Sequence, residues 1–417
     1  MQTRSINMKK YSIFSGNFFR ITAAFLFFSA VRGADIFLNN VTGDDLNSGR
    51  TPSEAVRTQS RAIDLSRPSD RIIAANTGTV YDGSIAFTAK SGEKGKPIIF
   101  DGSFAVFRGT RPIDFSGYTH QGNGLYSKET DLSRLQNRYF IVFGGRMENM
   151  GRCSKGNRAP WKKKEQLGDY EFSYDESARI LYLKIPSQKS LSECSIEAPE
   201  ELLSGIAVMD SSHLIFRNII VTHFWNDGCN LHKHCDDIRF ENIIAFENGD
   251  DSVSAHETGT LFMSNFIGIR NSTGIANSST TQVTMINCWF EDIIGQDVLI
   301  GLNKTGLEHI LRNAWFEGSS PRGVLIAGCA AVFENCVFLN KRATPVNFTM
   351  RDCTAHLKNC YQSNHTVLIQ TDNDSREAQE SLTRSKMNEA VAVKDYLTNV
   401  FRAVFGGTIL TTYGFKP

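Results

Sequence analysis

The sequence predicts an all-β fold in which short parallel strands stack as the coils of a solenoid. Residues 213–236 and 237–260 match position by position at an offset of 24 residues. Asparagines follow strand-like runs at intervals of 22 to 26 residues, at Asn218, Asn242, Asn265, Asn287, Asn313, Asn335 and Asn359. Units of this length are too short for a strand–helix pair and too long for one strand, and a fixed period indicates stacked repeats.

The first segment, residues 1–33, is predicted to be a signal peptide. Lys9, Lys10 and Arg20 precede the apolar run 21–31, and small residues before Ala34 offer a cleavage site. The run is too short to cross about 30 Å of hydrocarbon. We therefore expect a secreted, periplasmic or extracellular protein with no membrane segment in its mature form.

The segment 34–137 is predicted to hold an N-terminal cap and the first coils. Residues 35–40 have the pattern of a strand, and Pro52 opens a predicted helix that ends near Leu65. Short β-like runs bounded by turn residues follow. A helix at the end of a solenoid covers an otherwise unpaired strand edge.

Three further segments complete the predicted organisation. Residues 138–200 interrupt the period and are predicted to form a small β insertion with a hairpin around Asp175-Glu176-Ser177. Residues 201–371 carry the β-helix repeats. Residues 372–417 have helical spacing and are predicted to cap the solenoid or pack along its flank.

Composition limits the class of protein. The chain has 417 residues, a formal charge of +1, 41% hydrophobic residues and 21% charged residues, which is typical of a globular protein. A near-neutral charge argues against a nucleic-acid partner. Nine cysteines without a Cys-x-x-Cys pair favour buried thiols over a zinc site. We expect a monomer.

The asparagine row is interpreted as structural. In a solenoid each coil lies about 4.8 Å from the next. An asparagine that recurs at one bend can bond to the asparagines above and below it, which satisfies amides that would be costly to bury unpaired.

The 24-residue offset also aligns chemically active side chains. Asp227 falls over Asp251, and His232 falls over His256. Strand alternation sends Asp250, Ser254 and His256 to the outer face, together with Asn230 and His232 of the coil before. Asp227 and Asp251 have the opposite parity, so we expect them in the bend at the strand start.

On these features the chain resembles the right-handed parallel β-helix, or pectate-lyase-like, superfamily from about Asp35 to Gln370. Within it, Asn226-Asp227-Gly228 and, one coil later, Gly249-Asp250-Asp251 resemble the motifs of polygalacturonase-type glycoside hydrolases. That family's Gly-His-Gly motif has no counterpart near Thr273-Gly274. The resemblance implies that Asp250 is the general acid, with Asp227 and Asp251 positioning the attacking water.

The predicted function is therefore a carbohydrate-active enzyme, a glycoside hydrolase acting on a polysaccharide. Crowded carboxylates raise one another's pKa, as a general acid requires, and glycoside hydrolysis uses two of them. No metal or other cofactor is expected. The predicted catalytic residues are Asp227, Asp250, Asp251 and His256. The predicted substrate-binding residues are Asn230, His232, Ser254, Glu257 and Arg322.

Three alternatives remain open at this stage. One is a polysaccharide lyase or epimerase acting on uronic acids, with Ca²⁺ bound by Asp227, Asp236, Asp237, Asp250 and Asp251. Another is a glycan-binding or surface β-helix protein without catalysis. The third is a metal hydrolase built on His232, His234 and His256.

Overall fold

In the computed structural model, residues 33–417 form one compact unit. The described residues are 33–155, 159–301, 306–319, 322–341, 346–362, 369–371 and 387–412. The predicted signal peptide, apart from Gly33, and the tail residues 372–386 lie outside them.

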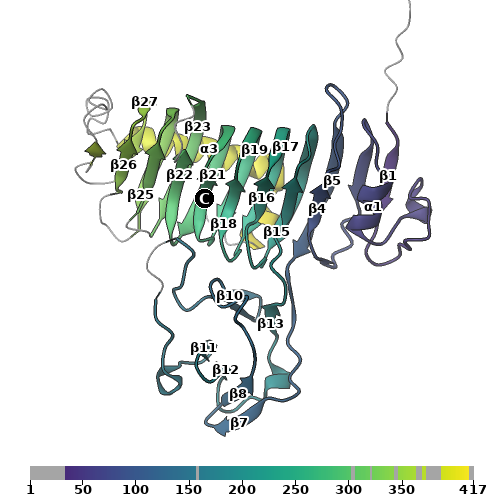
Figure 1. Ribbon diagram of the computed structural model, residues 1–417, viewed down its shortest axis with the longest axis vertical. Coiled ribbons are helices and arrows are strands. Elements are labelled where there is room, and N and C mark those ends of the chain that lie inside the picture. Colours follow the sequence, from purple (N-terminus) through teal and green to yellow (C-terminus); the bar gives the residue numbers. More distant parts are fainter. Residues whose placement is uncertain are drawn as a thin grey trace, which may run out of the picture. The chain divides into compact units, whose positions relative to one another are not determined.

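Two long parallel sheets form the body of this unit and confirm the predicted all-β, parallel β-helix fold (Figure 1). In spatial order the first sheet contains β1 (Asp35–Leu38), β2 (Arg71–Ala74), β5 (Ile98–Arg108), β15 (Leu214–Thr222), β17 (His234–Phe246), β19 (Thr258–Ile269), β21 (Thr280–Ile293), β23 (Glu308–Gly318), β25 (Ala330–Asn340) and β27 (Thr354–Lys358). At its side β3 (Tyr81–Asp82) pairs with β5, and β28 (Tyr361–Gln362) pairs with β25. The second sheet contains β4 (Ile85–Thr88), β14 (Ile206–Met209), β16 (Cys229–His232), β18 (Asp251–Ala255), β20 (Thr273–Asn277), β22 (Gln296–Gly301), β24 (Val324–Ala327), β26 (Phe348–Arg351) and β29 (Ile369–Thr371).

The asparagine row forms the predicted ladder. Its members occupy the left-handed region, with φ between 51° and 59°; the first six lie inside the strands β15 to β25 of the first sheet, and Asn359 lies between β27 and β28. Asparagine tolerates this conformation better than other side chains. Each side-chain amide donates to the asparagine of the preceding coil over 2.8 to 3.2 Å, from Asn242 onto Asn218 through to Asn359 onto Asn335. The ladder holds the coils in register.

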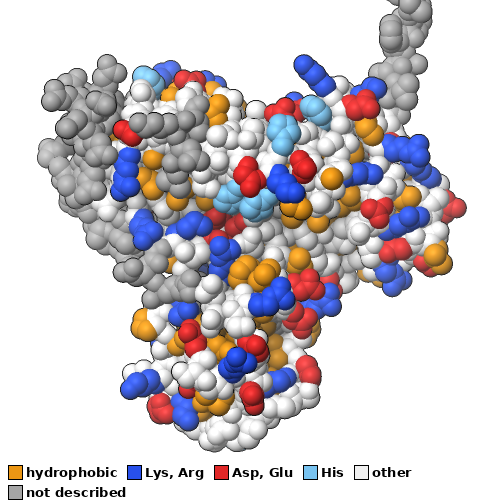
Figure 2. Space-filling model, in the orientation of Figure 1, with side chains coloured by type: hydrophobic (Ala, Val, Ile, Leu, Met, Phe, Trp, Pro, Cys, Tyr) orange, Lys and Arg blue, Asp and Glu red, His pale blue; other side chains and the backbone are white. Residues whose placement is uncertain are grey.

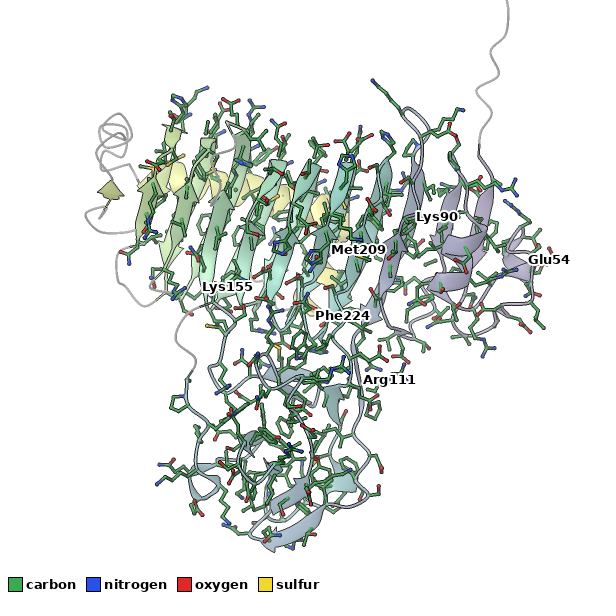
Figure 3. All side chains as sticks on the ribbon, viewed as in Figure 1. Glu54, Lys90, Arg111, Lys155, Met209 and Phe224 are labelled. Atoms are coloured by element: carbon green, nitrogen blue, oxygen red, sulfur yellow. The ribbon has the colours of Figure 1, made fainter. Side chains whose placement is uncertain are left out.

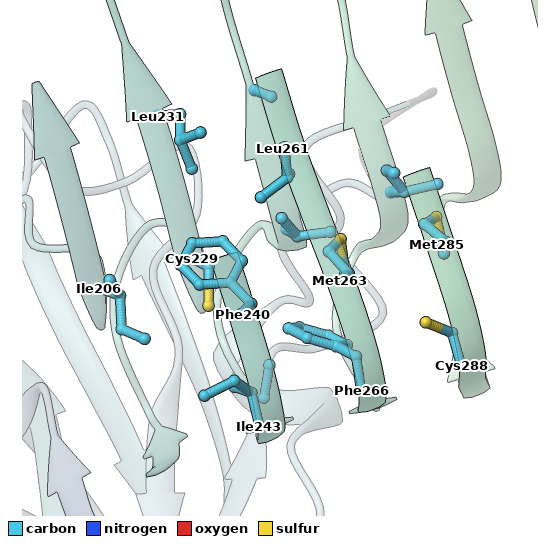
Figure 4. Close-up of a cluster of buried hydrophobic side chains, with 14 of the residues drawn as sticks. Ile206, Cys229, Leu231, Phe240, Ile243, Leu261, Met263, Phe266, Met285 and Cys288 are labelled. Atoms are coloured by element: carbon cyan, nitrogen blue, oxygen red, sulfur yellow. The ribbon is translucent and has the colours of Figure 1, made fainter. Parts of the chain in front are cut away.

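The space between the two sheets is filled by one apolar core (Figure 4). Inward residues of successive coils stack, as Phe290, Phe316 and Phe338 do with ring centroids 5.1 Å apart. Cys336 and Cys360 lie in the same core, and all nine cysteines of the chain are free. The expectation that cysteines pack rather than bridge is confirmed.

A β insertion leaves the solenoid directly after β5 and has its own apolar core. Its two four-stranded antiparallel sheets are built from β6 (Thr110–Pro112), β7 (Thr119–Gly122), β8 (Leu125–Glu129), β9 (Ile141–Phe143), β10 (Arg146–Glu148), β11 (Glu171–Asp175), β12 (Ile180–Lys184) and β13 (Ile196–Pro199). The 3₁₀ turns η2 (Lys164–Gln166) and η3 (Leu191–Glu193) connect them. Strands β11 and β12 form the predicted hairpin. Strand pairing also places β6, β7 and β8 in the insertion, so it starts near Thr110 rather than at residue 138.

Helices cover parts of the solenoid. The turn η1 (Pro52–Glu54) and helix α1 (Gln59–Leu65) lie at the N-terminal end, where one longer helix was expected. Helices α3 (Met387–Phe405) and α4 (Gly407–Thr412) confirm the helical tail within the described residues. Phe401 and Phe405 pack in a second apolar cluster with Trp289 and Trp315 of the first sheet. No helix in the described part of the chain is long and apolar enough to cross a membrane.

Candidate active site

The three predicted aspartates meet where strands β16 and β18 begin. One carboxylate oxygen from each of Asp227, Asp250 and Asp251 lies within 4.8 Å of the other two. The backbone N–H of Asp251 donates to Oδ1 of Asp227 over 3.0 Å, which locks two neighbouring coils together. Sterics explain why the Asn-Asp-Gly motif ends in glycine, because a Cβ on Gly228 would lie only 2.7 Å from the Cβ of Ala245.

The β insertion supplies two cations that cover this cluster. The Arg138 guanidinium lies 2.6 Å from Oδ2 of Asp250. The Lys155 ammonium lies 3.1 Å from both Asp250 and Asp251 (Figure 3). The hydroxyl of Ser154 donates to Asp250 as well. Each of the three aspartates is only 2% exposed, so the carboxylates form a closed ionic layer between the solenoid and its insertion.

The cluster separates the three carboxyl groups by charge state. Burial and the negative charge of Asp250 raise the pKa of Asp227 to about 7. Burial, with Asp250 again the largest charge, raises the pKa of Asp251 well above its usual value. Burial also opposes ionisation of Asp250, but Lys155 and Arg138 outweigh it and lower the pKa of that carboxyl. Asp251 and Asp227 therefore keep their protons to higher pH than Asp250, which the family resemblance had assigned as the acid.

A pair of stacked histidines lies at the other end of the same strands. The rings of His232 and His256 are 4.8 Å apart and inclined by 18°. His256 bonds to the hydroxyls of Ser254 and Ser278, each over 2.6 Å. Burial and His232 lower the pKa of His256 to about 4, so its ring is neutral at pH 7. Figure 2 shows histidine side chains gathered over β16 and β18 with acidic and basic groups beside them.

The remaining predicted site residues separate into two groups. Asn230 is buried against Asp227, to which its amide donates, and Ser254 is fully buried. Glu257 is exposed beyond the far end of β18 and accepts from the backbone N–H of Lys233. Arg322 is exposed and near enough to Cys153 to act on the pKa of that thiol.

The expected open groove is absent at the aspartates, since Asn230 and Ser254 have outward parity and yet are 4% and 0% exposed. The residues that cover the cluster, Arg138, Ser154 and Lys155, were not predicted from the sequence. They lie in the insertion, whose residues have no fixed offset from the coils, so the period gave no signal for them.

The residues around the cluster offer oxygen atoms that could bind a hard cation. Beside the three carboxylates, Oδ1 of Asn230 and Oγ1 of Thr273 are buried with no hydrogen-bond partner among the described residues. Thr273 pairs with Asp251 across β18 and β20. Five oxygens of this kind suit Ca²⁺, provided that Lys155 withdraws.

Two of the aspartates suggested as calcium ligands are elsewhere. Asp237 bonds to His213 and Arg239, and Asp236 accepts from Thr260, all beyond the far end of β16. A calcium site that includes Asp236 and Asp237 was therefore a wrong expectation.

Comparisons with known proteins agree with this fold. No family model matches the chain, and no curated protein matches it. A solved structure titled "Glycoside hydrolase" is 11% identical, with a TM-score of 0.52, and the match covers 86% of this chain and all of that one. This likeness supports the parallel β-helix fold and nothing beyond the fold.

Two further solved structures are similar over most of their length. Pectate lyase Pel9A is 13% identical, with a TM-score of 0.39 and coverage of 86% of each chain. A rhamnogalacturonan lyase is 13% identical, with a TM-score of 0.35, and the match covers 86% of this chain and 94% of that one.

Proposed function

We propose that the protein is a carbohydrate-active enzyme that hydrolyses glycosidic bonds in a polysaccharide. The observation that carries the proposal is the buried set of three carboxyl groups, in which Asp250 is ionised while Asp251 and Asp227 hold protons at higher pH than usual. Carboxyl groups whose environments push their pKa values apart are the usual basis for assigning an acid and a base. The fold's likeness to a structure titled as a glycoside hydrolase is compatible with this chemistry.

The geometry suggests a division of roles. Asp251, whose pKa is raised well above its usual value, protonates the departing glycosidic oxygen as the bond to the anomeric carbon breaks. Asp227, with its pKa near 7, takes the proton from the water whose oxygen attacks that carbon. Asp250 stays ionised, keeps both pKa values raised and stabilises the positive charge that develops on the sugar.

Substrate access requires the covering residues to move. The aspartates are 2% exposed, and Lys155 and Arg138 occupy the space above them. A polysaccharide would displace the segment around Ser154 and Lys155 and exchange its ion pairs for contacts with the sugar.

A glycan digestion tests the proposal. The purified protein is incubated with a panel of plant, algal and animal polysaccharides, and the products are identified by mass spectrometry. Hydrolysis gives fragments that have gained one water per cleaved bond. Binding without any product from the panel would instead support the glycan-binding alternative and overturn the enzymatic proposal.

A calcium-dependent lyase is the second candidate. It is favoured by the unpartnered oxygens of Asn230 and Thr273 beside the three carboxylates. These five residues would hold the cation, which would neutralise the carboxylate of a bound uronic acid. One observation argues against a lyase that uses Lys155 as its base. Burial alone would lower the pKa of Lys155, but the charges of Asp251, Asp250 and Asp227 outweigh burial and raise it, so the ammonium group holds its proton firmly. Products with an unsaturated sugar, formed only with added Ca²⁺ and lost with EDTA, would establish the lyase.

We also propose that the protein is exported. A basic segment followed by the apolar run 21–31 supports a signal peptide. Free thiols are compatible with export here because the cysteines of the solenoid core are buried away from oxidants. N-terminal sequencing of the protein recovered outside the cytoplasm should begin near Ala34, whereas an intact Met1 would contradict export by this route.

A further inference from the structure

A cavity lies apart from the aspartates, between the insertion, the first sheet and helix α4. Its volume is about 650 Å³, within the range of roughly 300–1,000 Å³ usual for small-molecule sites. Arg146 lines it from strand β10, Phe246 and Arg270 from the solenoid, and Thr412 from α4. Asp227, Asp250 and Asp251 are not among its lining residues, so it is not part of the candidate active site.

The charges around this cavity are unequally matched. Arg108 is bound to Glu197 over 2.7 Å, and Lys341 is bound to both Asp292 over 2.7 Å and Glu291 over 3.1 Å. Arg270 is bound to Glu247 over 2.6 Å. Arg146 is exposed and forms no ion pair with any described residue. A guanidinium without a carboxylate partner is therefore left at the rim of a cavity whose other cations are neutralised.

Two buried polar atoms beside the cavity also lack partners. Oγ1 of Thr222 and Nδ1 of His223 make no hydrogen bond with the described residues, and these two lining residues are 5% and 6% exposed. His223 uses its other nitrogen, Nε2, to contact Oε2 of Glu247 over 3.0 Å.

Glu247 is ionised, because His223 and Arg270 outweigh burial and lower its pKa. Nε2 of His223 contacts this carboxylate, and the other ring nitrogen, Nδ1, is left without a partner among the described residues. A buried polar atom without a hydrogen-bond partner destabilises the protein, and a bond to a ligand hydroxyl would offset that cost.

We propose that this cavity binds a short anionic oligosaccharide. A carboxylate on the sugar would receive two parallel hydrogen bonds from the Arg146 guanidinium. A neighbouring hydroxyl would form hydrogen bonds with Nδ1 of His223 and Oγ1 of Thr222. The edge of Phe246 and the apolar side chains of Val80 and Val106 would contact the sugar ring. The site would hold a polysaccharide chain or a product without taking part in bond cleavage.

Isothermal titration calorimetry with trigalacturonate tests this site. We expect one-to-one binding by the wild-type protein, and binding at least tenfold weaker for the methyl-esterified trisaccharide, which keeps the hydroxyls and loses the charge. A sulfated disaccharide of similar size separates a requirement for carboxylate from a requirement for any anion. Binding of the neutral ester as tight as that of the acid would overturn the proposal.

Variants locate the bound sugar. Arg146→Gln should weaken trigalacturonate binding at least tenfold, and Thr222→Val should weaken it several-fold. The matched control is Arg111→Gln, an exposed arginine of the same insertion that does not line the cavity, and it should bind as the wild type does (Figure 3). Both arginine substitutions lie at the surface, and thermal unfolding checks that the fold is intact.

The result is separable from the proposed catalysis. Asp251→Asn should retain trigalacturonate binding whether or not the protein proves to be a hydrolase. If Lys155→Gln abolishes binding while Arg146→Gln does not, the sugar is bound at the aspartates and the cavity assignment is wrong.

Discussion

The asparagine ladder and the aspartate cluster are both polar side chains stacked from coil to coil, and they differ in how they are satisfied. In the ladder each amide both donates and accepts, so Asn265 bonds to Asn242 on one side and to Asn287 on the other. Carboxylates have no donor, and their stacking brings like charges together. The aspartates need raised pKa values and the cations Arg138 and Lys155 from outside the repeat.

The difference separates architecture from a candidate site. A polar stack that satisfies itself adds stability at any pH and needs nothing beyond the repeat. A stack that requires protons and borrowed cations costs stability, and proteins accept such a cost mainly at functional sites. Substitutions of single residues in each stack test this difference between the ladder and the aspartate cluster.

The largest expected effect is on catalysis. Asp251→Asn removes the proposed proton donor and should lower the turnover of a cleaved glycan by about 10²–10⁴-fold. The rate is measured as reducing ends released under saturating substrate. The matched control is Asp237→Asn in the same coil, where Asp237 is tied to His213 and Arg239 far from the cluster. Equal activity of the two variants would remove Asp251 from the mechanism.

The next effect is on stability as a function of pH. Because the pKa of Asp227 is raised to about 7 in the folded protein, the folded state holds more protons than the unfolded state. Wild-type stability should therefore fall as the pH rises from about 4 to about 7. Asp227→Asn removes this loss, so its stability relative to the wild type should improve by roughly 2 kcal/mol between pH 5 and pH 8.

Urea unfolding at each pH measures this difference. A gap between Asp227→Asn and wild type that stays constant with pH would mean that Asp227 is ionised throughout. The candidate active site would then lose one of its two proposed proton carriers.

Breaking the ladder should affect stability without affecting chemistry. Asn265→Gly keeps the left-handed backbone accessible but removes two side-chain hydrogen bonds, and should cost about 1–3 kcal/mol at every pH. Asn359→Gly is the control, because its described side-chain bond is the single exposed one to Asn335. A loss of turnover per folded molecule in Asn265→Gly would contradict a purely structural ladder.

The smallest expected effect concerns His256. Its pKa is lowered to about 4, so it gains no charge between pH 5 and pH 8. The shape of the pH–rate profile should be the same in His256→Gln as in the wild type across that interval. A limb near pH 6 that disappears in the variant would make His256 a proton carrier after all.

The sequence is informative wherever the period operates. Asn218 through Asn359, the inward aromatic residues and the meeting of Asp227 with Asp251 follow from a fixed offset, because residues one coil apart become neighbours. Residues of the insertion have no fixed offset from the coils, so their neighbours cannot be predicted in this way. Arg138 and Lys155 reach the aspartates through long-range packing, and their charges reverse the expected order of the pKa values of Asp250 and Asp251.

The burial of the candidate active site could not be predicted from the sequence for the same reason. Strand alternation predicts which side of a sheet Asn230 and Ser254 face, but whether that side is open depends on what the insertion covers.

Infrared difference spectroscopy of the carboxyl groups tests the central claim most directly, namely that the stacked aspartates hold a proton at neutral pH. We predict that the wild-type protein at pH 7 shows the C=O stretch of a protonated carboxylic acid and that Asp251→Asn loses intensity in that band. A wild-type spectrum with only ionised carboxylates at pH 7 would contradict the account, because no group in the cluster could then act as a general acid.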